Sequence, residues 1–160
     1  MQRDYSFAHE ADGGPAGKAV ARILSCRGCS FALAQHTTLE ILEDPQALAV
    51  PQGSPHAIGL LPWQGRRIAL IDAGVLLAGA LGRAGPPRYA LVVAMQSAPG
   101  LPIEHGAIAL DTLPRSVLVD DGAWCPIPQG ARWHSAAISC FTHEGRPIPI
   151  VDTARLFGRG

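Results

Sequence analysis

The stretch that decides the fold runs from residue 57 to residue 78 and reads AIGLLPWQGRRIALIDAGVLLA. Shifted by 80 residues, it recurs at positions 137 to 158 as AISCFTHEGRPIPIVDTARLFG. A recurrence of this density indicates that one structural unit is written twice in the chain. The identical positions are Ala57 and Ala137, Ile58 and Ile138, Gly65 and Gly145, Arg66 and Arg146, Ile68 and Ile148, Asp72 and Asp152, and Leu76 and Leu156.

The repeat extends upstream with a shift of 77 residues, because Pro51-Gln52-Gly53 recurs as Pro128-Gln129-Gly130. A loop insertion accounts for the change of shift. Ser54-Pro55-His56 in the first copy is replaced by the longer segment 131–136 in the second. We therefore interpret nearly the whole chain as two copies of a single unit.

Each copy is predicted to consist mainly of short strands. Segments rich in β-forming and small apolar residues flank the turn dipeptides Arg27-Gly28 and Gln64-Gly65, which is typical of β-hairpins. Asp72 and Asp152 each precede an apolar run and are predicted to be the N-cap residues of short helices. Segment 37–43 fits either a helical turn or a strand. The expected strands are 23–25, 30–33, 57–61, 67–71, 89–94, 107–110, 117–119, 137–141 and 147–151.

The chain has 160 residues, of which 18 are glycine and 14 are proline. This length and this density of turns predict a mainly β fold of two small barrels with about five strands each. We expect a flexible tail at 1–19 and one domain at 20–160, with a first barrel at about 20–83 and a second at about 86–158. Barrels of this size are marginal alone, so we expect them to share an apolar seam, with a groove along it.

The charge balance argues against nucleic acid as a partner, since 13 basic and 13 acidic residues give a net charge of zero. Only 16% of the residues are charged and 48% are hydrophobic, which favours contact with other proteins. The most apolar stretch, 69–81, contains Asp72 and is too short to span a bilayer. Because residues 1–18 also lack the apolar core of a signal peptide, we expect a cytoplasmic protein that does not insert into a membrane.

Two alternative activities involve cysteine or aspartate. Cys26 and Cys29 form a C-x-x-C pair that can hold zinc or cycle as a redox pair, although a hairpin turn between them favours a structural role. Cys125 and Cys140 lie fifteen residues apart and supply no further ligands at a standard zinc-site spacing.

Asp72 and Asp152 resemble the paired carboxylates of aspartic hydrolases, in which two close carboxyl groups share a proton. Ala73 and Ala154, however, stand where such a site needs a hydroxyl and a glycine, and helix capping explains both aspartates. The sequence also contains none of the common nucleophile, metalloprotease, phosphate-loop or dinucleotide signatures. A non-enzymatic protein is therefore favoured.

Large side chains at or near the expected turns are candidates for partner binding. Trp63, Trp124 and Trp133 either anchor a partner or fill the seam between the barrels, and the sequence leaves both open. Arg66 and Arg67 form either a solvated hairpin end or a charged rim for an acidic partner.

The order of these motifs resembles the CheW-like chemotaxis coupling family, with this chain as a divergent member. Residues 59–72, GLLPWQGRRIALID, stand where that family has Gly-Val-x-Asn-Leu-Arg-Gly followed by Val-x-Pro-Val-Ile-Asp. Residues 38–41, TLEI, resemble its Val-x-Glu-Ile segment, and Pro51 resembles its proline before the glycine strand. The likeness covers about residues 20 to 158.

This resemblance implies two pseudo-symmetric five-stranded SH3-like β-barrels with short helices, without catalysis or a cofactor. It implies a cytoplasmic adaptor that couples the tips of methyl-accepting chemoreceptors to the regulatory domain of a chemosensory histidine kinase, as part of a two-component signalling system. The binding positions of the family fall on Thr38, Gly59, Gln64 and Gly65, and Trp63 and Arg66 are expected as neighbouring contacts.

Two departures affect the centre of the expected contact. The family arginine before the turn glycine is Gln64 here, and the family asparagine is Pro62, which removes a charge-assisted donor and a backbone N–H. We interpret the chain as the coupling protein of a divergent array, such as one that controls type IV pilus motility. The alternative is a protein that has kept the fold and lost the coupling role.

Overall fold

The computed structural model describes residues 18–51 and 53–158. The predicted tail, residues 1–19, lies outside these ranges apart from Lys18 and Ala19, which already belong to the first strand. The strands are β1 (Lys18–Cys26), β2 (Cys29–Ala34), β3 (Thr38–Glu43), β4 (Ala57–Trp63), β5 (Arg66–Ile71), β6 (Tyr89–Met95), β7 (Glu104–Leu110), β8 (Arg115–Asp120), β9 (Ala137–His143) and β10 (Arg146–Val151). The helices are α1 (Ala73–Ala78), α2 (Ala131–Ala136) and α3 (Thr153–Leu156), and the 3-10 turns are η1 (Gln35–Thr37) and η2 (Asp121–Ala123).

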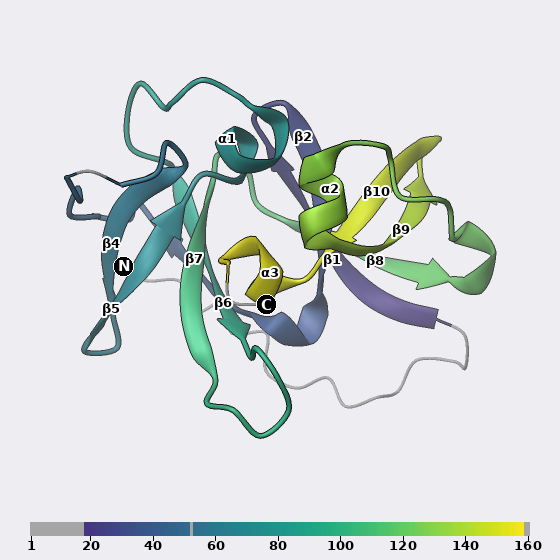
Figure 1. The fold of residues 1–160 in the computed structure, drawn as a ribbon, viewed down its shortest axis with the longest axis horizontal. Coiled ribbons are helices and arrows are strands. Elements are labelled where there is room, and N and C mark those ends of the chain that lie inside the picture. Colours follow the sequence, from purple (N-terminus) through teal and green to yellow (C-terminus); the bar gives the residue numbers. More distant parts are fainter. Residues whose placement is uncertain (1–17, 52, 159–160) are drawn as a thin grey trace.

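Figure 1 shows how the strands are arranged in space. The strands form two five-stranded sheets. We name them sheet A, with the order β8-β1-β2-β10-β9, and sheet B, with the order β3-β6-β7-β5-β4. The predicted strands are all present, and segment 38–43, which the sequence left open, is a strand. The mainly β fold class with two five-stranded sheets and short helices is confirmed.

The strand order corrects the predicted division into consecutive barrels. Sheet A takes β1 and β2 from the first copy and β8, β9 and β10 from the second, whereas sheet B takes β3, β4 and β5 from the first copy and β6 and β7 from the second. The boundaries at 20–83 and 86–158 therefore separate the two sequence copies but not the two sheets. The exchange occurs in both directions, because β3 of the first copy pairs with β6 and β8 of the second copy pairs with β1.

The two sheets nevertheless repeat each other in detail. Asp72 Oδ1 accepts a hydrogen bond from the backbone N–H of Val75, and Asp152 Oδ2 accepts one from Arg155, each at 3.1 Å, so both predicted N-caps are confirmed. The β4–β5 and β9–β10 pairs carry a register irregularity at the same place, beside Ile71 and Val151 respectively. The approximate two-fold relation predicted from the repeat is therefore present in the backbone.

Residues 131–136 are a helix, α2, where the sequence suggested a loop insertion. Trp133 of this helix packs against the largest core cluster, which stabilises the short segment through burial and not through propensity. That cluster draws side chains from both sheets, including Leu24 and Phe31 from sheet A and Leu91 and Ile108 from sheet B. The predicted apolar seam is confirmed.

Each sheet also has a smaller core cluster of its own. Trp63 belongs to the cluster of sheet B. Trp124, in contrast, is 46% exposed. Among the described residues, every helix is too short or too polar to cross a membrane.

Candidate protein-binding site

Three of the predicted contact residues lie together at the tip of the β4–β5 hairpin. Gln64 and Gly65 have φ angles of 46° and 72°, the left-handed pair that a two-residue type I′ turn requires. Gln64, Gly65 and Arg66 are exposed. A Cβ atom placed on Gly65 would meet none of the described atoms within 4 Å, so the tip is open to a partner.

Trp63 supports this tip from inside. Its side chain is only 9% exposed, and its indole N–H donates a hydrogen bond to the carboxylate of Glu40 on β3. The indole also contacts the imidazole of His105 on β7, with ring centroids 4.9 Å apart and planes inclined by 48°. Trp63 therefore connects the hairpin to the neighbouring strand β7 and to β3 at the opposite edge of the sheet, and it offers little surface to a partner.

Thr38 and Gly59 are buried away from the tip. Thr38 is 2% exposed, accepts a hydrogen bond from Nε of Arg22 at 3.0 Å and donates one to the carbonyl of Gln35 at 2.7 Å. A Cβ on Gly59 would lie 2.2 Å from the carbonyl oxygen of Leu48, so only glycine allows this close approach of the two backbones. Both residues are held in these structural contacts and lie below the surface that a partner would meet.

A groove of about 400 Å³ adjoins the hairpin tip. Arg66 and Arg67 border it from β5, while Met95, Ile103 and Phe157 supply apolar surface. Ile103, just before β7, is 57% exposed, and Phe157 directly follows α3. The sequence analysis missed Ile103 and Phe157. The parallel pairing of β5 with β7 brings Ile103 to the groove, and the close approach of the Phe157 ring to Gly106 brings Phe157 there, and neither contact has a local sequence signal.

The groove has a cationic rim. Burial and the nearby positive charge of Arg66 lower the pKa of His105, which also borders the groove. His105 is therefore neutral at neutral pH, and the exposed side chains of Arg66 and Arg67 provide the positive charge. Glu104 also lines the groove and adds one carboxylate to it. An arginine rim around apolar surface is a common feature of protein-binding sites.

The hairpin tip of the second copy lies at the opposite end of the molecule in Figure 1 and has a different charge. Glu144, Gly145 and Arg146 occupy the positions of Gln64, Gly65 and Arg66. Glu144 lies 3.8 Å from Nη1 of Arg115 and 3.6 Å from Nε2 of His143. The acidic side chain offsets the charge of Arg146, so only the β4–β5 tip is purely cationic.

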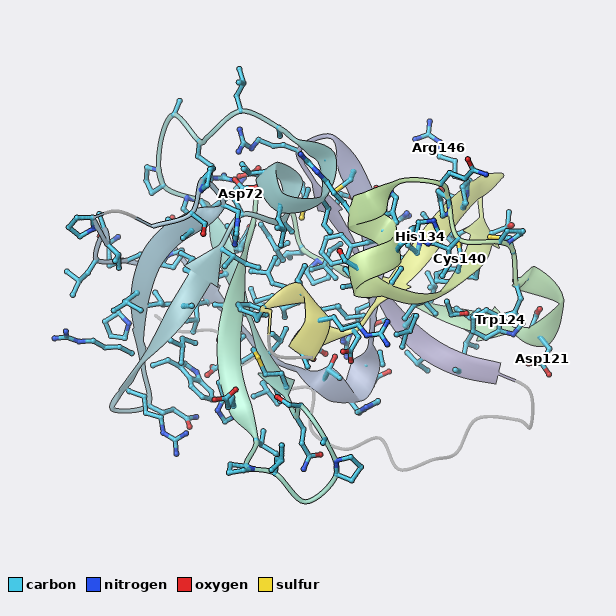
Figure 2. All side chains as sticks on the ribbon, in the orientation of Figure 1. Asp72, Asp121, Trp124, His134, Cys140 and Arg146 are labelled. Atoms are coloured by element: carbon cyan, nitrogen blue, oxygen red, sulfur yellow. The ribbon has the colours of Figure 1, made fainter. Side chains whose placement is uncertain are left out.

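The two aspartates of the hydrolase alternative have separate structural roles. Asp72, beside α1 in Figure 2, is buried and lies 2.6 Å from Nη2 of Arg27 and 3.6 Å from Nη1 of Arg83. Asp152 caps α3. Each carboxylate therefore has partners of its own: two guanidinium groups and the N-terminus of α1 for Asp72, and the N-terminus of α3 for Asp152. The geometry gives no support to an aspartic dyad.

The C-x-x-C pair likewise has a structural setting. Cys26 and Cys29 lie opposite each other at the end of the β1–β2 hairpin, with Arg27-Gly28 as the predicted turn. Burial, followed by the charge of Asp72, raises the pKa of Cys29 to about 11, and burial also raises the pKa of Cys26. Within the described ranges, His, Cys, Asp and Glu form no group of three or more that could hold a metal ion. The zinc alternative therefore has no support.

Comparison with known proteins finds a likeness in structure alone. The chain matches no known family profile, and no curated protein matches its sequence. The crystal structure of the scaffolding protein TtCheW from Thermoanaerobacter tengcongensis superposes with a TM-score of 0.71 and 15% sequence identity. The match covers 88% of this chain and 92% of that one. The chain therefore has a CheW-like fold, as its sequence motifs predicted.

Proposed function

We propose that this protein is a non-enzymatic scaffold or adaptor of a bacterial chemosensory system. The observation that carries the proposal is the likeness in fold, over nearly the full length of both chains, to a protein described as a scaffold. In this role the protein works in the cytoplasm and joins the tips of methyl-accepting chemoreceptors to the regulatory domain of a chemosensory histidine kinase.

The β4–β5 tip and its groove are the proposed kinase-binding surface. Gln64, Gly65 and Arg66 present exposed polar and cationic groups, and the groove beside them adds apolar area. A partner of matching chemistry has an acidic patch next to an apolar side chain, because complementary charge steers association and apolar burial supplies affinity. Arg66 provides the positive charge that Gln64 lacks.

The test is direct binding of the purified protein to the regulatory domain of a histidine kinase from the same cell, measured by calorimetry. We expect a Kd in the micromolar range or tighter. Arg66→Glu reverses the charge at the proposed surface and should weaken binding at least tenfold. Arg146→Glu is the matched control, because Arg146 has the same place at the β9–β10 tip, and it should leave the Kd unchanged.

Two outcomes would count against different parts of the proposal. Failure to bind any chemosensory kinase or receptor fragment from the same cell would overturn the adaptor function. Equal effects of Arg66→Glu and Arg146→Glu on a genuine complex would leave the function standing and would overturn the assignment of the surface.

We further propose that the array controls type IV pilus motility, because Pro62 and Gln64 replace two residues of the usual coupling motif. Deletion of the gene should then reduce twitching on a surface and leave flagellar swimming unchanged. Loss of swimming with normal twitching would contradict this assignment.

A further inference from the structure

Cys125 and Cys140 occupy paired positions on neighbouring backbone segments of sheet A. Residues Trp124 and Phe141 form an antiparallel bridge, which places Cys125 directly opposite Cys140 on β9. The backbone N–H of Cys125 donates a hydrogen bond to the carbonyl of Cys140 at 3.1 Å. Directly opposed residues in such a pair have Cα atoms about 5.5 Å apart, which lies within the range that a disulfide bond spans.

The first copy shows that this pairing is built into the fold. Leu48 and Leu60 stand at the equivalent positions, and they exchange two backbone hydrogen bonds of 2.8 and 2.9 Å. Where sheet B has two leucines, sheet A has two thiols whose sulfur atoms lie 3.1 Å apart. The two cysteines therefore meet because of the fold, although they are far apart in the sequence pattern.

The two thiols differ in solvent exposure, and this difference determines which of them reacts first with an oxidant. Cys140 is completely buried, and burial followed by the contact with Cys125 raises its pKa to about 12. Cys125 is partly exposed, in the loop that also carries the exposed Trp124, and Figure 2 shows Trp124 and Cys140 in the same outer part of sheet A. A small oxidant reaches Cys125 first, and Cys140 is positioned behind it as the second thiol.

We propose that Cys125 and Cys140 form a peroxide-sensitive modification site that closes into a disulfide bond. In the first step the thiol of Cys125 releases its proton, the thiolate attacks hydrogen peroxide and the O–O bond breaks. A sulfenic acid forms, and the departing hydroxide takes up the released proton to become one water. In the second step the sulfur of Cys140 attacks the sulfenic sulfur, the S–O bond breaks, and the hydroxyl leaves as water with the proton of Cys140. Two thiols are oxidised by two electrons, and one peroxide is reduced to two waters.

The bond would tie both ends of the segment that carries α2. This helix contacts α1 and α3, and Nη1 of Arg132 donates a hydrogen bond to the carbonyl of Val75 at 3.3 Å. Closing a loop of this size restricts the unfolded chain, so the oxidised protein should melt roughly 5–10 °C higher than the reduced protein. Oxidation at this site would thus stabilise the part of the protein in which α2 packs against the seam between the two sheets.

The experiment treats the full-length reduced protein with hydrogen peroxide and maps its disulfides by mass spectrometry. We expect the loss of two thiols from the four cysteines, with Cys125 joined to Cys140 and with Cys26 and Cys29 still reduced. The Cys26→Ser/Cys29→Ser variant is the matched control and should lose two thiols in the same way. A disulfide between Cys26 and Cys29, a dimer linked through Cys125, or four intact thiols would each overturn the proposal.

Single variants test the order of the steps. Cys140→Ala should stop the reaction at the sulfenic acid of Cys125, which dimedone traps, whereas Cys125→Ser should give no trapped product. Trapping on Cys140 in Cys125→Ser would contradict the assigned order. The disulfide map of the wild-type protein decides the proposal even if a variant fails to fold, and its readout is independent of kinase binding.

Discussion

Sheets A and B have the same backbone plan, but the side chains that lock them differ. In sheet B, Trp63 is buried and donates a hydrogen bond to Glu40, whereas His143 stands at the equivalent position of sheet A. Asp72 caps its helix and also pairs with two arginines, whereas Asp152 acts as a cap. The duplication has therefore preserved turns and caps, whereas, among the described residues, the side-chain contacts at Trp63 and at Asp72 are found in one copy and not at the matching residues of the other. Each copy supplies a control for the other.

The largest difference in stability between matching variants of the two copies is expected at Trp63. Trp63→Ala removes a buried indole together with its contacts to Glu40 and His105, and should lower the free energy of unfolding by about 4 kcal/mol. His143→Ala at the equivalent position should cost less than about 1 kcal/mol. Urea unfolding of the two variants measures both values. Similar losses of unfolding free energy in the two variants would mean that Trp63 and His143 stabilise their sheets equally, which would contradict this prediction.

Gly59 gives the next largest effect. Gly59→Ala forces a Cβ to within 2.2 Å of the carbonyl oxygen of Leu48, and should cost about 3 kcal/mol as the covering segment is displaced from β4. The second copy already carries a side chain at the equivalent position, Ser139, so Ser139→Ala should change stability by less than about 0.5 kcal/mol. Hydrogen exchange at the Leu48 and Leu60 amides should show the displacement. Unchanged protection in Gly59→Ala would contradict this account.

Comparing variants of the two aspartates distinguishes the contribution of helix capping from the contribution of ion pairing. Asp152→Ala loses an N-cap and should cost about 1 kcal/mol. Asp72→Ala loses the same cap and also leaves Arg27 and Arg83 without their shared carboxylate, so it should cost about 2 kcal/mol. Thermal unfolding at low and high salt is the measurement, and the excess cost at Asp72 should shrink as salt rises. An equal cost for both variants would show that the ion pairs contribute nothing.

The parts of the fold that the sequence predicted correctly are local. The turns at Gln64-Gly65 and Arg27-Gly28 and the caps at Asp72 and Asp152 each depend on a few adjacent residues. The exchange of strands between the copies was not predictable in this way. The matching strands β1 and β6 offer similar partners to β3 and β8, and no local feature of the sequence distinguishes between them.

The candidate site was predictable to the same extent. The hairpin tip with Gln64, Gly65 and Arg66 follows from turn chemistry and from the family resemblance. The burial of Trp63 depends on Glu40 and His105, which lie on two other strands, so the sequence left its role open. The pairing of Cys125 with Cys140 likewise requires the bridge between two distant segments.

The smallest expected effect is a pH dependence confined to sheet B. The pKa of His105 is lowered in the folded protein, first by burial and then by Arg66, so the unfolded chain binds a proton more readily than the folded one. The stability that depends on neutral His105 is present above pH 6.5 or so and is lost as the pH falls below this value. By strand pairing, Ser30 stands at the equivalent position of sheet A, and a serine hydroxyl does not titrate in this range.

His105→Gln should therefore flatten the fall in Tm between about pH 7 and pH 5, whereas His134→Gln, at an exposed position on α2, should leave it unchanged. Arg66→Gln should raise the pKa of His105 towards its ordinary value, as an NMR titration of the imidazole would show. A rise in Tm on acidification of the wild-type protein that His105→Gln removes would reverse the sign and contradict the assignment. Because Arg66 belongs both to this titration and to the proposed kinase contact, a shift of the His105 resonance on addition of the kinase domain would report directly on occupation of the tip.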